Sequence, residues 1–135
     1  MPAGYSGTPL AKKLTLKDDM RVWFDAMPGS IRAEIDEGGL SFTEETGPVD
    51  GLNAAHIFVT TQAALDAKLA SLRRTIEPAG QVWVSWPKKA SKMPTEIAQG
   101  DVQKAGLAIG FVDTKKCAVD EVWSGLKFVI RKELR

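Results

Sequence analysis

A short lysine-rich loop carries the side chains best suited to bind a negatively charged ligand. Lys88, Lys89 and Lys92 follow Trp86 closely, no acidic residue separates them, and Ser91 adds a hydroxyl. Ammonium groups, a hydroxyl and the N-terminus of a following helix all favour a phosphate or a carboxylate, through charge and hydrogen-bond donation. These five residues are therefore predicted to form an anion site. The alternative is a solvated loop, because runs of lysine usually keep a surface soluble.

The turn after the first predicted strand is a second candidate. Turns that bind nucleotide cofactors in α/β folds are rich in glycine, because glycine lets the backbone approach both the ligand and the following helix. The turn at 25–29 has a single glycine, Gly29, and its Pro28 offers no amide hydrogen. Asp25 and Ser30 are the polar side chains that a ligand could contact here.

An acidic residue that binds ribose hydroxyls is expected about 20 positions beyond such a turn. Glu44 and Glu45 lie near that distance, but they belong to a stretch, 32–50, that is mainly acidic. An acid in such a stretch is weak evidence for ribose binding. The turn and these acids together favour a degenerate site that holds no cofactor.

The chain has one histidine and one cysteine, which limits the chemistry available to it. No disulfide can form within the chain, and no metal site is expected without a set of thiolate or imidazole ligands. His56 is expected at the start of an apolar strand, remote from the ligand-binding edge, in a structural role. Cys117 is expected to be a buried thiol in a strand, although neighbouring lysines would lower its pKa if it were exposed. The serines lack a nucleophile elbow, so a hydrolase triad is not expected.

Length and charge place the chain among ordinary globular proteins. Its 135 residues suit one domain spanning 1–135, with 44% hydrophobic and 26% charged residues. A net charge of +1 provides no general attraction to nucleic acid or to an anionic membrane surface. The sequence shows no apolar run as long as a signal peptide core or a membrane span, so a cytoplasmic location is expected.

The elements that must position these residues alternate between strands and helices. Apolar runs and helical spacing of leucines separate the two types, and glycine and proline mark the ends. A short stretch at 40–42 is also compatible with a strand, followed by a polar loop. Strands are predicted at 20–24, 56–60, 81–86, 111–119 and 126–132, and helices at 8–14, 30–37, 61–76 and roughly 96–109.

This alternation predicts a single α/β domain of Rossmann-like, three-layer architecture. Its sheet is expected to be mostly parallel, with the last two strands forming a C-terminal antiparallel hairpin. Such a sheet resembles the fold of the methyltransferases that use S-adenosylmethionine (SAM), and residues 123–129 look like the last strand of that fold. The comparison concerns the fold only.

Three blocks of sequence resemble a bacterial family of small proteins catalogued as a domain of unknown function. The blocks are GYSGTPLAKKL at 4–14, VSWPKKASK at 84–92 and CAVDEVWSGLK at 117–127. They span most of the chain and include the lysine-rich loop. The family brings no assigned activity, cofactor or catalytic residue, so the resemblance implies a fold and no reaction.

These observations favour a non-catalytic binding or interaction domain over an enzyme. Its loop at 87–92 would bind an anionic small molecule or a protein partner, and no cofactor is expected. The alternative is a minimal SAM-dependent methyltransferase, for which little chain length remains to bind an acceptor. Nucleic-acid binding through the lysines is disfavoured by the near-neutral charge. Pairing between exposed edge strands is compatible with a homodimer.

Overall fold

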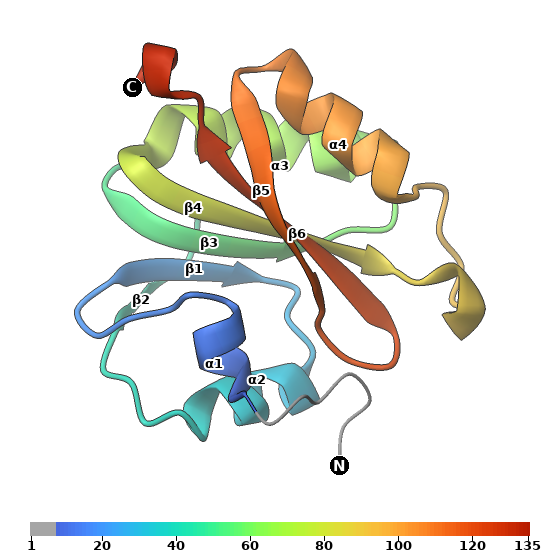
Figure 1. Cartoon of the computed structure of the whole chain (residues 1–135), viewed down its shortest axis with the longest axis horizontal. Helices are drawn as coiled ribbons and strands as arrows, with labels where there is room; N and C mark the ends of the chain where they lie inside the picture. The colour runs from blue at the N-terminus through green and yellow to red at the C-terminus, as the bar shows by residue number, and fades with distance from the viewer. Residues whose placement is uncertain (1–7) are drawn as a thin grey trace.

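One mixed β-sheet runs through the chain in the computed structural model, which describes residues 8–135 (Figure 1). Its strands are β1 (Arg21–Asp25), β2 (Thr43–Glu45), β3 (Leu52–Phe58), β4 (Ile76–Pro87), β5 (Phe111–Ala118) and β6 (Trp123–Ile130). Their order across the sheet is β2-β1-β3-β4-β6-β5. The first four strands of that order are parallel, and β6 runs antiparallel to both β4 and β5. The mostly parallel sheet and the C-terminal hairpin are thus confirmed.

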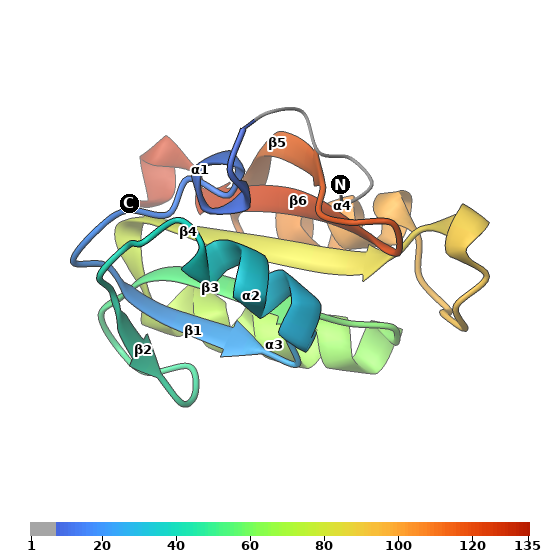
Figure 2. The same cartoon turned by 90° about the horizontal axis from the view of Figure 1, so that it is seen from below.

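Helices cover both faces of the sheet, which gives the predicted three layers. They are α1 (Leu10–Lys13), α2 (Gly29–Asp36), α3 (Gln62–Thr75) and α4 (Gln99–Ala108), with 3-10 turns at Lys89–Ser91 and Lys132–Leu134. α1 and α2 lie on one face, and α3 lies on the other (Figures 1 and 2). Each face has its own apolar core, and the core beneath α3 also takes in Val102 of α4. No helix within residues 8–135 is both long and apolar enough to cross a membrane.

The helix α3 forms where the leucine spacing predicts it. Leu65, Leu69 and Leu72 are fully buried, and they recur at the three- and four-residue intervals that place side chains on one helix face. The Thr61 hydroxyl accepts a hydrogen bond from the amide of Ala64, which satisfies one of the free amides at the helix start. Local spacing and capping therefore agree with the tertiary packing.

Three strands begin earlier than the sequence suggests, and one of them is β6, which starts at Trp123 and not at 126. β3 starts at Leu52 and not at His56, because Leu52 is also buried and Asn53 only interrupts the apolar run. β4 starts at Ile76, directly after α3, so Pro78 and Gly80 lie within the strand and not in a turn. The pairing of β3 with β4 is irregular between Leu52 and Ala54, and this irregularity accommodates the proline-containing segment.

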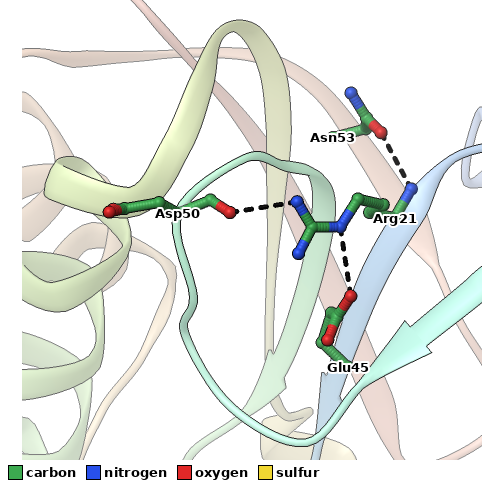
Figure 3. A network of polar contacts seen from close by, with 4 residues as sticks. All are labelled: Arg21, Glu45, Asp50 and Asn53. Atoms are coloured by element: carbon green, nitrogen blue, oxygen red, sulfur yellow. Dashed lines mark hydrogen bonds and ion pairs between the residues drawn. The ribbon is translucent and has the colours of Figure 1, made fainter.

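The second strand also differs from its prediction, because it comprises Thr43–Glu45 and not 40–42. Tertiary ion pairs hold this polar strand at the sheet edge. Arg21 Nε donates to Glu45 Oε2 at 3.1 Å, and Arg21 Nη1 donates to the Asp50 carbonyl at 3.1 Å (Figure 3). The amide of Arg21 donates to Asn53 Oδ1 at 2.8 Å. Arg21 of β1 therefore forms hydrogen bonds to β2, to the loop that follows β2 and to β3.

Neither Ser30 nor Thr95 caps a helix, although each hydroxyl lies near a helix start, where such side chains often do. α2 begins at Gly29 after Pro28, without a side-chain cap, so Ser30 lies in the first turn and does not cap it. α4 begins at Gln99, and the Asp101 carboxylate accepts from the amide of Ala98 at 2.9 Å, so Thr95 is not its cap. Residues 4–7 of the first matching sequence block lie outside the described residues.

Candidate functional site

The strand order reverses between β1 and β3. This reversal identifies the carboxyl ends of these two strands as the place where a ligand is expected. β1 pairs with β2 on one side and with β3 on the other. α2 connects β1 to β2 on one face, and α3 connects β3 to β4 on the opposite face (Figure 2). In open α/β sheets ligands bind beyond the carboxyl ends of the strands at such a switch point. The turn after β1 and the residues after β3 meet there.

The turn after β1 presents backbone groups rather than side chains. Ala26 has a left-handed backbone with φ of 56°, a conformation that glycine adopts without cost. The amides of Gly29 and Ser30, at the start of α2, have no hydrogen-bond partner among residues 8–135. A Cβ built on Gly29 would meet nothing within 4 Å. The turn therefore leaves free amides, at the positive end of a helix, beside open space.

The acidic residues near this turn are engaged in ion pairs. Asp25 pairs with Lys68 of α3, and the two side chains are 25% and 30% exposed. Glu44 Oε1 lies 2.5 Å from Arg32 Nη1 of α2. The other carboxylate oxygen of Glu44 has no partner among the described residues. Glu44 therefore has a free carboxylate oxygen, which can accept a hydrogen bond, on the face of the sheet that carries α2. Asp25 instead forms its ion pair with a residue of α3, on the opposite face.

The lysine-rich loop does not bring its charged groups together as the sequence predicted. The Lys88 ammonium donates to the Asp120 carbonyl at 2.6 Å, and the Ser91 hydroxyl donates to the Lys88 carbonyl at 2.6 Å. Lys92 is exposed in a left-handed conformation with φ of 60°. Of the three lysines, only Lys88 and Lys89 line the cavity found next to this loop. Ser91 and Lys88 therefore serve mainly to shape the loop.

That cavity has a volume of about 450 Å³ and lies beyond the carboxyl end of β4. Trp86 and Ser124 stand opposite each other in the β4–β6 pair and form part of its wall. The segment before α4 forms another wall, and the amide of Glu96 donates to the Thr60 carbonyl at 3.0 Å. Because Thr60 follows β3, the same loop borders the switch point and supports the cavity. Its lining comprises Trp86, Pro87, Lys88, Lys89, Thr95, Glu96, Ile97, Ala98, Gln99, Asp101, Lys116 and Ser124.

The single histidine and the single cysteine are both buried, but His56 lies near the carboxyl end of β3, opposite Phe24, and not at the start of the strand as the sequence predicts. His56 lies inside β3, where Nε2 is 2.6 Å from Ser85 Oγ and burial lowers the pKa of the imidazole to about 3. Burial also raises the pKa of the Cys117 thiol, in spite of the lysines around it. At neutral pH both side chains are therefore uncharged. Residues 8–135 contain no group of three or more His, Cys, Asp or Glu side chains placed to hold a metal ion.

No family model and no curated protein matches the chain. Solved structures share its fold at low identity. PigF with SAH aligns with a TM-score of 0.61 and 10% identity, covering 91% of this chain and 61% of PigF. The ribosomal protein L11 methylase from Lactobacillus delbrueckii subsp. bulgaricus gives 0.59 and 11%, covering 90% of this chain and 74% of the methylase. Magnesium protoporphyrin IX methyltransferase (ChlM) from Synechocystis PCC 6803 with bound SAM gives 0.57 and 9%, covering 90% and 74%.

These structures establish the fold and correct the functional expectation. The chain has the Rossmann-like fold of SAM-dependent methyltransferases, as its sheet and hairpin indicated. The expectation of a non-catalytic binding domain, and the leaning against an enzyme, are wrong, because the structural neighbours include a methyltransferase and a methylase, and PigF and ChlM hold SAH and SAM respectively. They favour the alternative weighed from the sequence. The chain spans 61% of the length of PigF.

Proposed function

We propose that the chain binds SAM at the switch point and is a minimal SAM-dependent methyltransferase. The observation that carries this proposal is the fold, shared with structures that hold SAM or SAH, together with the open turn between β1 and α2. The fold supplies the location, and the turn supplies unpartnered backbone donors at that location. This proposal replaces the expectation that the chain uses no cofactor.

The residues around the turn fit the cofactor in part. The amides of Gly29 and Ser30 would receive the carboxylate of SAM, because a helix N-terminus favours a negative group. The unpartnered oxygen of Glu44 would accept hydrogen bonds from the ribose hydroxyls. Ala26 adopts the left-handed backbone conformation that a glycine usually provides in such a turn. Pro28 has no amide hydrogen, so the turn has one hydrogen-bond donor fewer than other turns of this type. When bound, SAM supplies an electrophilic methyl group.

Hydrogen bonds within the chain connect the loop after β3, which borders the proposed SAM site, to the wall of the neighbouring cavity. The Thr60 carbonyl accepts both from the amide of Glu96, at 3.0 Å, and from the Thr95 hydroxyl, at 3.3 Å. These bonds tie the loop after β3 to the cavity wall. Orientation of two ligands by such a shared loop is one way in which a protein accelerates a reaction between them. Membership of the bacterial family, a cytoplasmic location and a homodimer stay predictions from the sequence.

Thermal unfolding in the presence of SAM tests the proposal. A ligand that binds only the folded chain stabilises it by about 2.7 kcal/mol at a concentration of 100 Kd, so we expect a saturable rise in Tm of several degrees. SAH should act in the same way, because the groups that the turn and Glu44 would contact are present in both. Adenosine, which carries the shared nucleoside but no negative group, is the matched control and should give a smaller shift. No shift with SAM or SAH at millimolar concentration would contradict the proposal.

A further inference from the structure

A second cavity, of about 560 Å³, lies between the end of α1 and the segment that follows α2. α2 starts at the proposed SAM site and runs away from it, so this cavity lies at the opposite end of that helix (Figure 2). The two helices pack closely beside it, since a Cβ built on Gly38 would lie 3.1 Å from the Cβ of Ala11. Most of the lining residues are apolar, namely Pro9, Ala11, Leu16, Gly38 and Leu40.

The turn that ends α1 gives the cavity a fixed wall. Thr15 has a left-handed backbone with φ of 55°, and the amide of Leu16 donates to the Ala11 carbonyl at 3.0 Å, as in a Schellman motif. Gln81 of β4 donates from Nε2 to the Leu14 carbonyl at 2.8 Å, which attaches the turn to the sheet. The chain therefore reverses here, and lysines from both sides of the turn line the same cavity.

These two lysines give an apolar cavity a positive charge. Lys12 and Lys17 are exposed, and neither ammonium group has a hydrogen-bond or ion-pair partner within residues 8–135. Lys115 and Lys127 stand opposite each other in the β5–β6 hairpin, near Lys17. Burial lowers the pKa of Lys127, and the charges of Lys115 and Lys17 lower it further. Like charges thus gather on one side of the cavity, where an anion would stabilise them.

The acidic residues nearest to these lysines along the chain do not line the cavity. Asp18 and Asp19 line a neighbouring cavity, and Asp18 accepts from the amide of Ser41 at 2.7 Å. Asp36, at the end of α2, pairs with Arg32. Among the described residues, those that form the wall include no carboxylate. An anion in the cavity would therefore meet two ammonium groups and no negative charge in the wall.

The wall also presents apolar surface that a ligand can cover. Leu40 is half-buried and Pro9 is exposed, whereas Ala11 and Leu16 are buried. Lysine side chains add their apolar stems to such a wall while the ammonium groups stay in water. A cavity of about 300–1,000 Å³ that is mainly apolar, with a few polar groups, is typical of a site for a small molecule.

We propose that this cavity binds a small molecule that has an apolar chain and one carboxylate head group. The apolar chain lies against Leu40 and Pro9, and the carboxylate pairs with Lys12 and Lys17. A cationic head group would be repelled by the same lysines. The site is separate from the methyl transfer proposed above, because it lies at the other end of α2 from Gly29.

Octanoate, octylamine and butyrate test the two parts of this proposal in ¹H–¹⁵N titrations of the full chain. We expect octanoate to shift the amide signals of Leu16, Gly38 and Leu40 saturably. Octylamine has the same chain length class but the opposite charge, and it should bind about fivefold or more weakly. Butyrate keeps the carboxylate on a shorter chain, so it should bind about tenfold or more weakly.

A Lys12→Gln/Lys17→Gln variant should bind octanoate several-fold more weakly and lose the preference over octylamine. Lys92→Gln/Lys132→Gln is the matched control, because both lysines are exposed and outside the lining, and it should keep the affinity of the unaltered chain. The proposal is overturned if octylamine or butyrate binds as tightly as octanoate. Unmoved signals at Leu16 and Gly38, or an unchanged affinity in Lys12→Gln/Lys17→Gln, would also overturn it. All titrations omit SAM, so a failure here is distinct from a failure of SAM to bind.

Discussion

A Gly29→Val variant is expected to bind SAM at least tenfold more weakly than the unaltered chain. The valine side chain would fill the open space beside the unpartnered amides of Gly29 and Ser30, where the carboxylate of SAM is proposed to lie. A tenfold loss corresponds to about 1.4 kcal/mol of binding free energy. Isothermal titration calorimetry of SAM into both proteins measures it. Folding should be preserved, because a Cβ at Gly29 meets nothing within 4 Å and φ there is not left-handed.

Gly100 provides a matched control for this variant. It also lies in the first turn of a helix, α4, and a Cβ built on it likewise meets nothing within 4 Å. Gly100→Val should keep the SAM affinity of the unaltered chain, and both variants should unfold within a few degrees of it. Equal affinity in Gly29→Val and Gly100→Val would place SAM away from this turn.

Acidification is expected to destabilise the folded chain through its buried histidine. Burial lowers the pKa of His56 to about 3, whereas the imidazole of an unfolded chain titrates near 6.5. Between these values the unfolded chain binds a proton that the folded chain excludes. The stabilisation is therefore fully present above about pH 6.5, and it is lost as the pH falls, at up to about 1.4 kcal/mol per pH unit and about 5 kcal/mol in all.

Denaturant unfolding at pH 7, 6 and 5 measures this loss, and a His56→Gln variant isolates its cause. Glutamine can still bond to the Ser85 hydroxyl, but it does not titrate. Because the chain has a single histidine, the variant should lose the slope between pH 6.5 and 5, while carboxylates contribute mainly at lower pH. Parallel loss of stability in both proteins would show that His56 is not the group responsible.

The local part of the fold could be predicted from the sequence because local interactions determine it. Leu65, Leu69 and Leu72 place one apolar face on α3, and Thr61 caps it. In contrast, Glu44 and Glu45 are polar residues that form a strand only because Arg32 and Arg21, from other elements, pair with them. Tertiary ion pairs of this kind have no local signature, so the sequence predicts the second strand three residues too early.

The candidate site shows the same limit. Charge along the chain predicts Lys88 and Lys89, and the end of the strand predicts Trp86, as neighbours of the cavity. Charge also includes Lys92, which lies outside the cavity lining. Ser124 was missed, because its position opposite Trp86 depends on β6 pairing with β4, far apart in the sequence. The left-handed backbone at Ala26 has no signal in residue type, since alanine seldom adopts it. These features depend on register and backbone conformation.

The most direct test of the central claim is a ¹H–¹⁵N titration of the ¹⁵N-labelled chain with SAH, the more stable of the two ligands. Binding at the switch point predicts saturable shifts of the backbone amide signals of Gly29 and Ser30, together with signals from the loop at 59–61 after β3. Signals from the far edge of the sheet, in β5, should remain in place. If no signal shifts at saturating SAH, or if the shifts leave Gly29 and Ser30 unmoved, the chain does not bind this cofactor as proposed.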